Sequence, residues 1–235
     1  MLKLENITKH FSGITAVDGV SLSVNEGETV GIIGTNGAGK TTLFNILTGF
    51  ETADQGRIIY NGRIVTNLPP NRLTKFGIAR TFQNLRLFEE MTVRENLLVS
   101  AFAQRIDTKI CDDLLRKTDL FDKRDHLASS LCYGDMRKLE IARAVSTGAK
   151  LILLDEPSAA MTRGEALDLD RLIKRFKSDY TLTVLLIEHN MELVRLSCDR
   201  VYAMAEGRII FSGTPKETLS NPAVIKTMLK AEKIC

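Results

Sequence analysis

The sequence predicts an α/β protein in which helices flank a mixed β-sheet. Three short runs rich in Val, Ile and Leu are each followed by a helical pattern, which is typical of buried parallel strands. Two hairpin signals, Asn61-Gly62 and Glu206-Gly207, add antiparallel strands. Between about residues 85 and 146 the periodicity is helical. One compact unit is therefore expected, with a sheet core, antiparallel strands and an inserted helical segment.

The individual elements follow from local patterns. Strands are expected at Leu2–Ile7, Ser21–Val24, Thr29–Ile33, Arg57–Val65, Leu151–Leu154, Leu182–Ile187, Arg200–Ala205 and Arg208–Phe211. Helices are expected at Thr42–Leu47, Thr92–Ala103 and Thr108–Leu120. The second helix begins with Thr92 and Glu95 at the capping-box spacing, in which each side chain accepts a hydrogen bond from the backbone N–H of the other.

Composition excludes several classes of protein. The chain has 235 residues, 44% hydrophobic and 26% charged, as in an ordinary globular protein. Its net charge of +3 does not indicate a nucleic-acid-binding surface. The longest apolar runs fall far short of the roughly 18 to 20 residues that span a bilayer. No secretory signal pattern is visible and the four scattered cysteines suit free thiols, so the expected location is the cytoplasm.

The first motif with a clear chemistry follows the strand expected at 29–33. Gly34-Thr35-Asn36-Gly37-Ala38-Gly39-Lys40-Thr41 matches the phosphate-binding pattern G-x-x-x-x-G-K-[ST] and precedes a helical pattern. Glycines let the backbone turn its N–H groups toward phosphate oxygens, and the helix N-terminus adds positive charge. Lys40 is expected to reach the β- and γ-phosphates, Thr41 to offer its hydroxyl to Mg²⁺, and Thr42 to add a second hydroxyl. The plainer interpretation is a glycine-rich turn, which the flanking strand and helix disfavour.

Polar side chains end two more of the expected parallel strands. Asp155 and Glu156 close one apolar run, and Glu188-His189 closes another. Open α/β sheets bind ligands at the carboxyl ends of their strands. Asp155 therefore suits a Mg²⁺ ligand, Glu156 a general base that polarises water, and His189 a contact to a γ-phosphate. Paired acids here are otherwise a common helix N-cap, an alternative that the phosphate-binding loop weakens.

With these motifs in order, the sequence resembles the ATP-binding cassette (ABC) ATPases over essentially its full length. The deciding segment is Leu131-Cys132-Tyr133-Gly134-Asp135, which is similar to the LSGGQ signature of that family at the start of a helix. The remaining motifs of the family occur in its order: the phosphate-binding loop, Gln83, the signature, Asp155-Glu156, residues 158–161 and His189. A narrower resemblance, to the ATP-binding subunits of branched-chain amino acid importers, lies in residues 79–88, 91–97 and 139–144.

The resemblance implies a fold, ligands and partners. The implied fold is a P-loop NTPase (RecA-like) core at about residues 1–84 and 149–235, with an antiparallel β subdomain and a helical subdomain at about 85–148. The implied ligands are ATP and Mg²⁺, held in a head-to-tail dimer with a second ABC ATPase subunit that is identical or different. Further implied partners are transmembrane permease subunits, docked through residues 85–95 at the inner face of the cell membrane, and indirectly a solute-binding protein.

The resemblance also implies roles for individual residues. Phe11 would stack on adenine, Gln83 would contact Mg²⁺ and the attacking water, and His189 would hold the γ-phosphate. The signature residues would act in trans, on the ATP of the other subunit: Cys132, Tyr133, Gly134 and Asp135.

Several positions depart from the family pattern. Cys132 replaces the usual Ser of the signature and is a weaker hydrogen-bond donor. Asp135 replaces Gln and brings a negative charge nearer the ATP. Ala160 and Met161 depart from the usual end of the loop after Glu156, and the interval from Gln83 to the signature is shorter than in importers of this type. Slower hydrolysis and altered communication between subunits are expected.

The leading hypothesis is an ATP-hydrolysing motor subunit of a membrane importer, whose separate permease carries branched-chain or related amino acids. One alternative is the same motor serving another solute, such as urea, short amides or an exported lipid. A non-transport ABC protein of translation or DNA repair is a second alternative, which the single set of motifs disfavours. A third is a subunit that closes on ATP but hydrolyses it poorly, which Cys132 and Asp135 favour.

Overall fold

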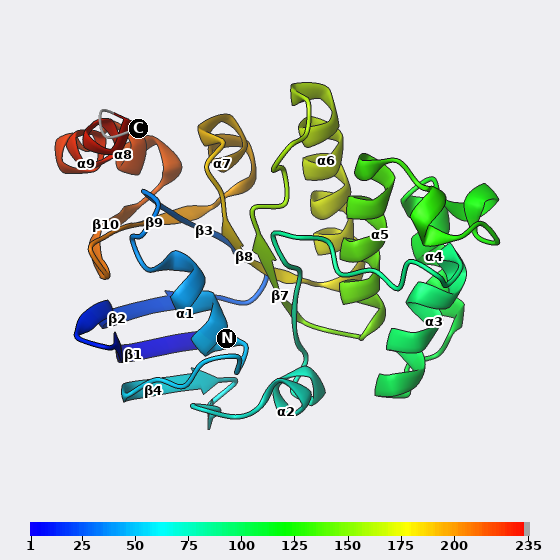
Figure 1. Cartoon of the computed structure of the whole chain (residues 1–235), viewed down its shortest axis with the longest axis horizontal. Helices are drawn as coiled ribbons and strands as arrows, with labels where there is room; N and C mark the ends of the chain where they lie inside the picture. Colours follow the sequence, from blue (N-terminus) through cyan, green and yellow to red (C-terminus); the bar gives the residue numbers. More distant parts are fainter. Residues whose placement is uncertain (233–235) are drawn as a thin grey trace. The chain divides into compact units, whose positions relative to one another are not determined.

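The computed structural model describes residues 1–232 (Figure 1). The chain divides into two compact units. The first unit contains residues 1–73 and the chain from Thr183 onward, and the second contains residues 74–182. Strands and helices occur in both units, so the predicted α/β class is confirmed. The helical segment predicted at about 85–148 falls inside the second unit.

An antiparallel sheet forms one part of the first unit. Its strands are β1 (Leu2–Phe11), β2 (Ile14–Val24), β4 (Gln55–Tyr60) and β5 (Arg63–Ile64), in the order β2-β1-β4-β5. The hairpin predicted at Asn61-Gly62 is confirmed, since φ is +47° and +76° at these residues, as a tight turn between twisted strands requires. β1 and β2 are longer than predicted because irregularities in their pairing after Leu4 break the alternation of buried and exposed residues.

A mixed sheet forms the other part of the first unit. β3 (Thr29–Gly34) pairs in parallel with β8 (Thr183–Ile187) and β9 (Arg200–Ala205), and β9 pairs antiparallel with β10 (Arg208–Gly213) through the predicted Glu206-Gly207 hairpin. β3 and β8 are buried along their whole length, which explains their continuous apolar sequences.

Helices cover both parts of the first unit. α1 (Lys40–Leu47) contacts β2 and β3 with its buried apolar residues. α8 (Pro215–Ser220) contacts α7 (Met191–Ser197), β9 and β10, and α9 (Pro222–Glu232) lies beside α8 (Figure 1).

The second unit is mainly helical. β6 (Ile78–Arg80) and β7 (Leu151–Asp155) pair in parallel, and α2 (Pro70–Lys75) precedes β6. α3 (Val93–Gln104), α4 (Lys109–Lys117) and α5 (Tyr133–Ser146) pack against one another, and α5 also contacts α6 (Arg163–Tyr180) and β6 (Figure 1). Short 3₁₀ turns occur at Phe121–Lys123 and Ala128–Ser130. α5 therefore occupies the centre of this unit.

Some elements differ from the sequence-based predictions. β6 was not predicted, because three residues are too few to establish a strand pattern. The capping box of Thr92 and Glu95 is confirmed, and similar boxes begin α6 and α8. Within residues 1–232, no helix has the length and apolar character needed to cross a bilayer. Cys111, Cys132 and Cys198 form no disulfide, and Cys235 lies outside the described residues.

Candidate nucleotide-binding site

The phosphate-binding loop connects β3 to α1 in the first unit. Gly39 is the N-cap of α1 with φ +97°, a left-handed conformation that favours glycine. A Cβ atom at Gly39 would lie 2.3 Å from the Ala16 carbonyl oxygen, and one at Gly34 would lie 2.4 Å from that of Met204. The surrounding backbone therefore leaves room only for glycine at both positions, which brings the loop backbone close to the β2 and β9 backbones.

Lys40 is almost completely buried, with 5% of its surface exposed. Its Nζ donates hydrogen bonds to the carbonyl oxygens of Gly34, at 2.8 Å, and Thr35, at 2.9 Å. Thr41 is exposed beside it at the start of α1, where the first backbone N–H groups of a helix lack intrahelical acceptors. The loop thus presents an ammonium, a hydroxyl and the positive end of a helix, which together suit an anionic phosphate. A phosphate would offer Lys40 stronger, charged acceptors than these carbonyls.

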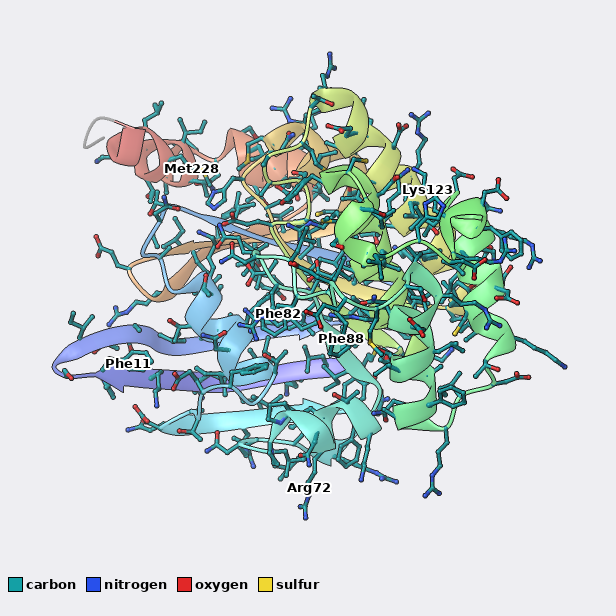
Figure 2. The ribbon with its side chains drawn as sticks, turned by 45° about the vertical axis from the view of Figure 1, so that its right-hand side comes forward. Phe11, Arg72, Phe82, Phe88, Lys123 and Met228 are labelled. Carbon is teal, nitrogen blue, oxygen red and sulfur yellow. The ribbon has the colours of Figure 1, made fainter. Side chains whose placement is uncertain are left out.

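The first unit also contains Phe11 and His189. Phe11 ends β1, its side chain is 40% exposed, and the Lys9 Nζ lies 5.2 Å from its ring centroid (Figure 2). His189 follows β8 and is exposed, while the preceding Glu188 is buried. The Glu188 carboxylate accepts hydrogen bonds from the backbone N–H groups of His189, at 2.9 Å, and Asn190, at 3.1 Å. These two hydrogen bonds hold the chain in a turn after β8. Sequence analysis assigned Glu188 no role, although a carboxylate directly after a buried strand often forms a turn of this kind.

In the second unit, the predicted metal ligand Asp155 forms a buried ion pair. Its Oδ2 lies 2.7 Å from Nη2 of Arg80, and both side chains are 5% exposed. The pair forms because Arg80 and Asp155 end two parallel strands, β6 and β7. The Arg80 nitrogen occupies one of the several lone-pair sites of the Asp155 carboxylate. The remaining sites can still bind a metal ion, so the ion pair is compatible with a metal at Asp155. Sequence analysis missed the role of Arg80.

The predicted general base lies beside the predicted water-contacting amide. Nε2 of Gln83 donates a hydrogen bond to Oε2 of Glu156 at 2.9 Å. Glu156 has φ +48°, a left-handed conformation that costs a residue with a Cβ atom about 1–2 kcal/mol. This conformation turns the chain immediately after β7. The second unit thus joins two residues that the sequence assigned to the same attacking water.

The signature residues form the exposed start of α5. Cys132 is the N-cap and Tyr133 is 40% exposed. The Asp135 carboxylate lies 2.6 Å from Nζ of Lys123 and 3.7 Å from Nζ of Lys138 (Figure 2 labels Lys123). The hydrogen bond to Asp135 raises the pKa of Lys123. The negative charge expected at this end of the signature is therefore paired with two cations, which the sequence analysis did not foresee.

Comparisons with known proteins identify the family. Residues 17–159, more than half of the chain, match the family described as ABC transporter. This chain belongs to that family. The ABC cassette is 39% identical over 249 residues to the protein of Salmonella typhimurium named high-affinity branched-chain amino acid transport ATP-binding protein LivG, and 97% of each chain is covered.

Two solved structures resemble this ABC cassette. One is the ADP conformation of MJ1267, an ATP-binding cassette of an ABC transporter, with 36% identity, a TM-score of 0.89 and coverage of 97% of this chain and 98% of that chain. The other is the dimeric post-hydrolysis state of the ATP-binding cassette MJ0796 bound to ADP and Pi. It has 26% identity, a TM-score of 0.80 and coverage of 92% of this chain and 99% of that chain. The predicted family and fold are confirmed, and the roles of single residues stay predictions.

Proposed function

We propose that this cassette is the ATP-hydrolysing motor subunit of an importer for branched-chain or related amino acids. The Gln83–Glu156 hydrogen bond is the observation that carries the hydrolytic role, because it holds a carboxylate beside an amide that can orient water. The likeness to LivG across nearly the whole chain supports the choice of solute.

The proposal gives each unit its own residues for nucleotide binding. The backbone N–H groups of the loop and Lys40 hold the phosphates, and the exposed ring of Phe11 stacks on adenine. Residues 132–135 of a second subunit cover the same nucleotide, in the head-to-tail arrangement that the family resemblance implies. The dimeric state of the related cassette MJ0796 supports a dimer.

Thr41 in the first unit, and Asp155 and Gln83 in the second, each offer the kind of oxygen that Mg²⁺ prefers: a hydroxyl, a carboxylate and an amide carbonyl. When bound, it neutralises charge on the β- and γ-phosphate oxygens. The ion pair with Arg80 keeps the Asp155 carboxylate in one orientation, which limits the reorganisation that binding requires.

Hydrolysis then depends on three side chains. The Glu156 carboxylate accepts the proton of a water molecule whose oxygen forms a bond to the γ-phosphorus. The bond from that phosphorus to the ADP oxygen breaks, and the products are ADP and inorganic phosphate. Gln83 orients Glu156 and the water, and His189 donates a hydrogen bond to the γ-phosphate.

The proposed partners are a second cassette and permease subunits at the cytoplasmic face of the cell membrane. The permease contact is residues 85–95, where the Phe88 side chain is 48% exposed. Closure of two cassettes on ATP would change which permease state is favoured, because only contacts that differ between two states can shift their equilibrium.

Phosphate release by the purified chain tests the hydrolytic role. Mg²⁺-dependent release should fall about 10²- to 10⁴-fold in Glu156→Gln, and this variant should elute as a dimer only when ATP is present. The matched control is Glu26→Gln, which changes an exposed glutamate outside the residues assigned to the site and should retain wild-type turnover. Equal turnover in wild type and Glu156→Gln would remove Glu156 from this role.

The solute is tested separately. Proteoliposomes that contain the cassette and its permease should take up leucine, isoleucine and valine when ATP is supplied on the cassette side. Uptake of urea in place of these amino acids would replace the proposed solute and leave the motor role intact.

A further inference from the structure

The centre of α5 contains an ion pair that is almost completely buried. The Arg137 side chain is 0% exposed, that of Glu140 is 2% exposed, and Nη1 of Arg137 lies 2.7 Å from Oε2 of Glu140. Burial raises the pKa of Glu140, although Arg137 and two backbone N–H groups oppose this change. A buried ion pair gains little stability over apolar residues of similar size. Apolar residues could serve stability as well, so the distinctive property of this pair is the set of hydrogen bonds that it makes one turn after the signature.

The pair holds the segment that carries Gln83. Nη1 of Arg137 donates to the Phe82 carbonyl oxygen and Nη2 donates to that of Gln83, both at 2.8 Å. Oε1 of Glu140 lies 3.5 Å from the Phe82 backbone nitrogen and 3.4 Å from that of Arg86. This segment follows β6 and has no regular secondary structure, so its backbone depends on such contacts for its position (Figure 2 labels Phe82).

The same arginine also contacts the signature. Nη2 of Arg137 donates a hydrogen bond to the Tyr133 hydroxyl oxygen at 2.8 Å, four residues earlier on the helix. One nitrogen of a planar guanidinium thus serves both Tyr133 and the Gln83 carbonyl, so a movement that changes one contact alters the other. The Gln83 side chain in turn reaches Glu156. The second unit therefore contains a continuous path of hydrogen bonds from the exposed signature to the proposed general base.

We propose that Tyr133 and Arg137 are positioning residues that link the signature to Gln83 and Glu156. The inference rests on the proposed function, in which the signature of one subunit covers the ATP of the other. Contact of Tyr133 with the partner's ATP then fixes Arg137, and Arg137 fixes the backbone of Gln83. Each subunit thereby aligns its own hydrolytic pair when its signature engages the opposite nucleotide.

The most direct test is Tyr133→Phe, which keeps the ring and removes only the hydroxyl. The expected result is a fall in kcat of about tenfold, the typical consequence of losing a hydrogen bond to a charged group, with little change in KM for ATP or in the thermal unfolding midpoint. Tyr180→Phe is the matched control, because the Tyr180 hydroxyl also bonds to charged side chains of the second unit, Asp113 and Lys117. Its kcat should equal that of the wild type.

A double-mutant cycle with Gln83→Ala decides whether Tyr133 acts through Gln83. In the Gln83→Ala background, Tyr133→Phe should cause no further loss of kcat, because the path is already broken. Independent losses that multiply in the double variant would overturn the inference, since Tyr133 would then act only on the partner's ATP. Arg137→Lys should lower kcat in the same way, but Tyr133→Phe keeps the test valid if that buried variant does not fold.

Wild-type turnover separates the two proposals. If the wild type releases phosphate, and the kcat losses of Tyr133→Phe and Gln83→Ala multiply in the double variant, only the positioning inference fails. If the wild type releases no phosphate in the presence of Mg²⁺ and ATP, the proposed function fails and the inference fails with it.

Discussion

The Lys123 ammonium lies 2.6 Å from the Asp135 carboxylate, close to the start of the signature helix. Lys123 comes from the 3₁₀ turn at Phe121–Lys123, and Asp135 lies in the first turn of α5. In the proposed dimer, this pair would oppose the repulsion between the Asp135 carboxylate and an anionic nucleotide. The acid is present, but its charge is balanced locally before ATP binds.

The first prediction concerns the pairing of the Asp135 carboxylate with Lys123. Lys123→Gln should raise the ATP concentration for half-maximal dimerisation about two- to fivefold, because the Asp135 charge is then opposed by Lys138 alone. The effect should shrink at high salt, since Lys123 is 47% exposed. Size exclusion at graded ATP concentrations measures it. The control introduces Lys123→Gln into a protein that already carries Asp135→Gln, where it should not change the ATP concentration for half-maximal dimerisation. An equal change in that protein would show that Lys123 does not act through Asp135.

The second prediction concerns Arg80 and Asp155. Arg80→Met should lower the free energy of unfolding by about 3–5 kcal/mol, because it leaves a buried carboxylate without its cation. Adding Asp155→Asn removes that charge and should recover most of the loss. Urea unfolding of the two variants measures the difference. Equal instability of the single and double variants would show that the lost packing of Arg80, and not the unpaired charge, is responsible.

Local patterns predicted those parts of the fold that depend on a few consecutive residues. Asn61-Gly62 specifies a tight turn by its backbone preferences, and in Glu206-Gly207 the glycine favours one of the two positive φ angles. The phosphate-binding loop is similarly local, because its glycines and Lys40 act within one strand–loop–helix unit. The capping box of Thr92 was predictable for the same reason.

Contacts between distant residues were not predictable in this way. Arg80 and Asp155 are 75 positions apart, and no local pattern indicates that their two strands are neighbours. Arg137 looks like a surface residue of an amphipathic helix, and only the packing around α5 shows that it is buried against the Gln83 segment. Motifs thus indicated the residues of the candidate site, whose individual roles stay predictions, but they did not indicate the buried side chains that contact them.

The third prediction compares two glycines of the phosphate-binding loop. Gly37 has φ +78° with nothing within 4 Å of an added Cβ, whereas a Cβ at Gly39 would lie 2.3 Å from the Ala16 carbonyl oxygen. Gly37→Ala should therefore lower the free energy of unfolding by about 1–2 kcal/mol, from backbone strain alone. Gly39→Ala should lower it further and weaken ADP binding, because the start of α1 must move. Chemical unfolding and ADP titration measure both effects, and equal values for the two variants would contradict this account.

The fourth prediction concerns acid stability and the three capping boxes. Glu95, Glu165 and Glu217 each accept a hydrogen bond at 2.8 Å from the backbone N–H of the threonine that caps their helix. These bonds, together with those from the threonine hydroxyls, lower the pKa of each carboxyl from its ordinary value. A lowered folded-state pKa stabilises the protein above the unfolded-state pKa, and the contribution is lost as the pH falls through the folded-state value. Stability should therefore decline from about pH 5 downward.

Replacing all three glutamates by glutamine tests this mechanism. Glutamine keeps an acceptor oxygen for the capping box but does not titrate, so the triple variant should be less stable than the wild type at neutral pH and should lose less stability between about pH 5 and pH 3. Urea unfolding across this pH range measures the two slopes. The control is the triple replacement of Glu26, Glu89 and Glu90, which are exposed and outside the three boxes. If both triple variants flatten the pH dependence equally, the effect comes from total charge and not from the helix caps.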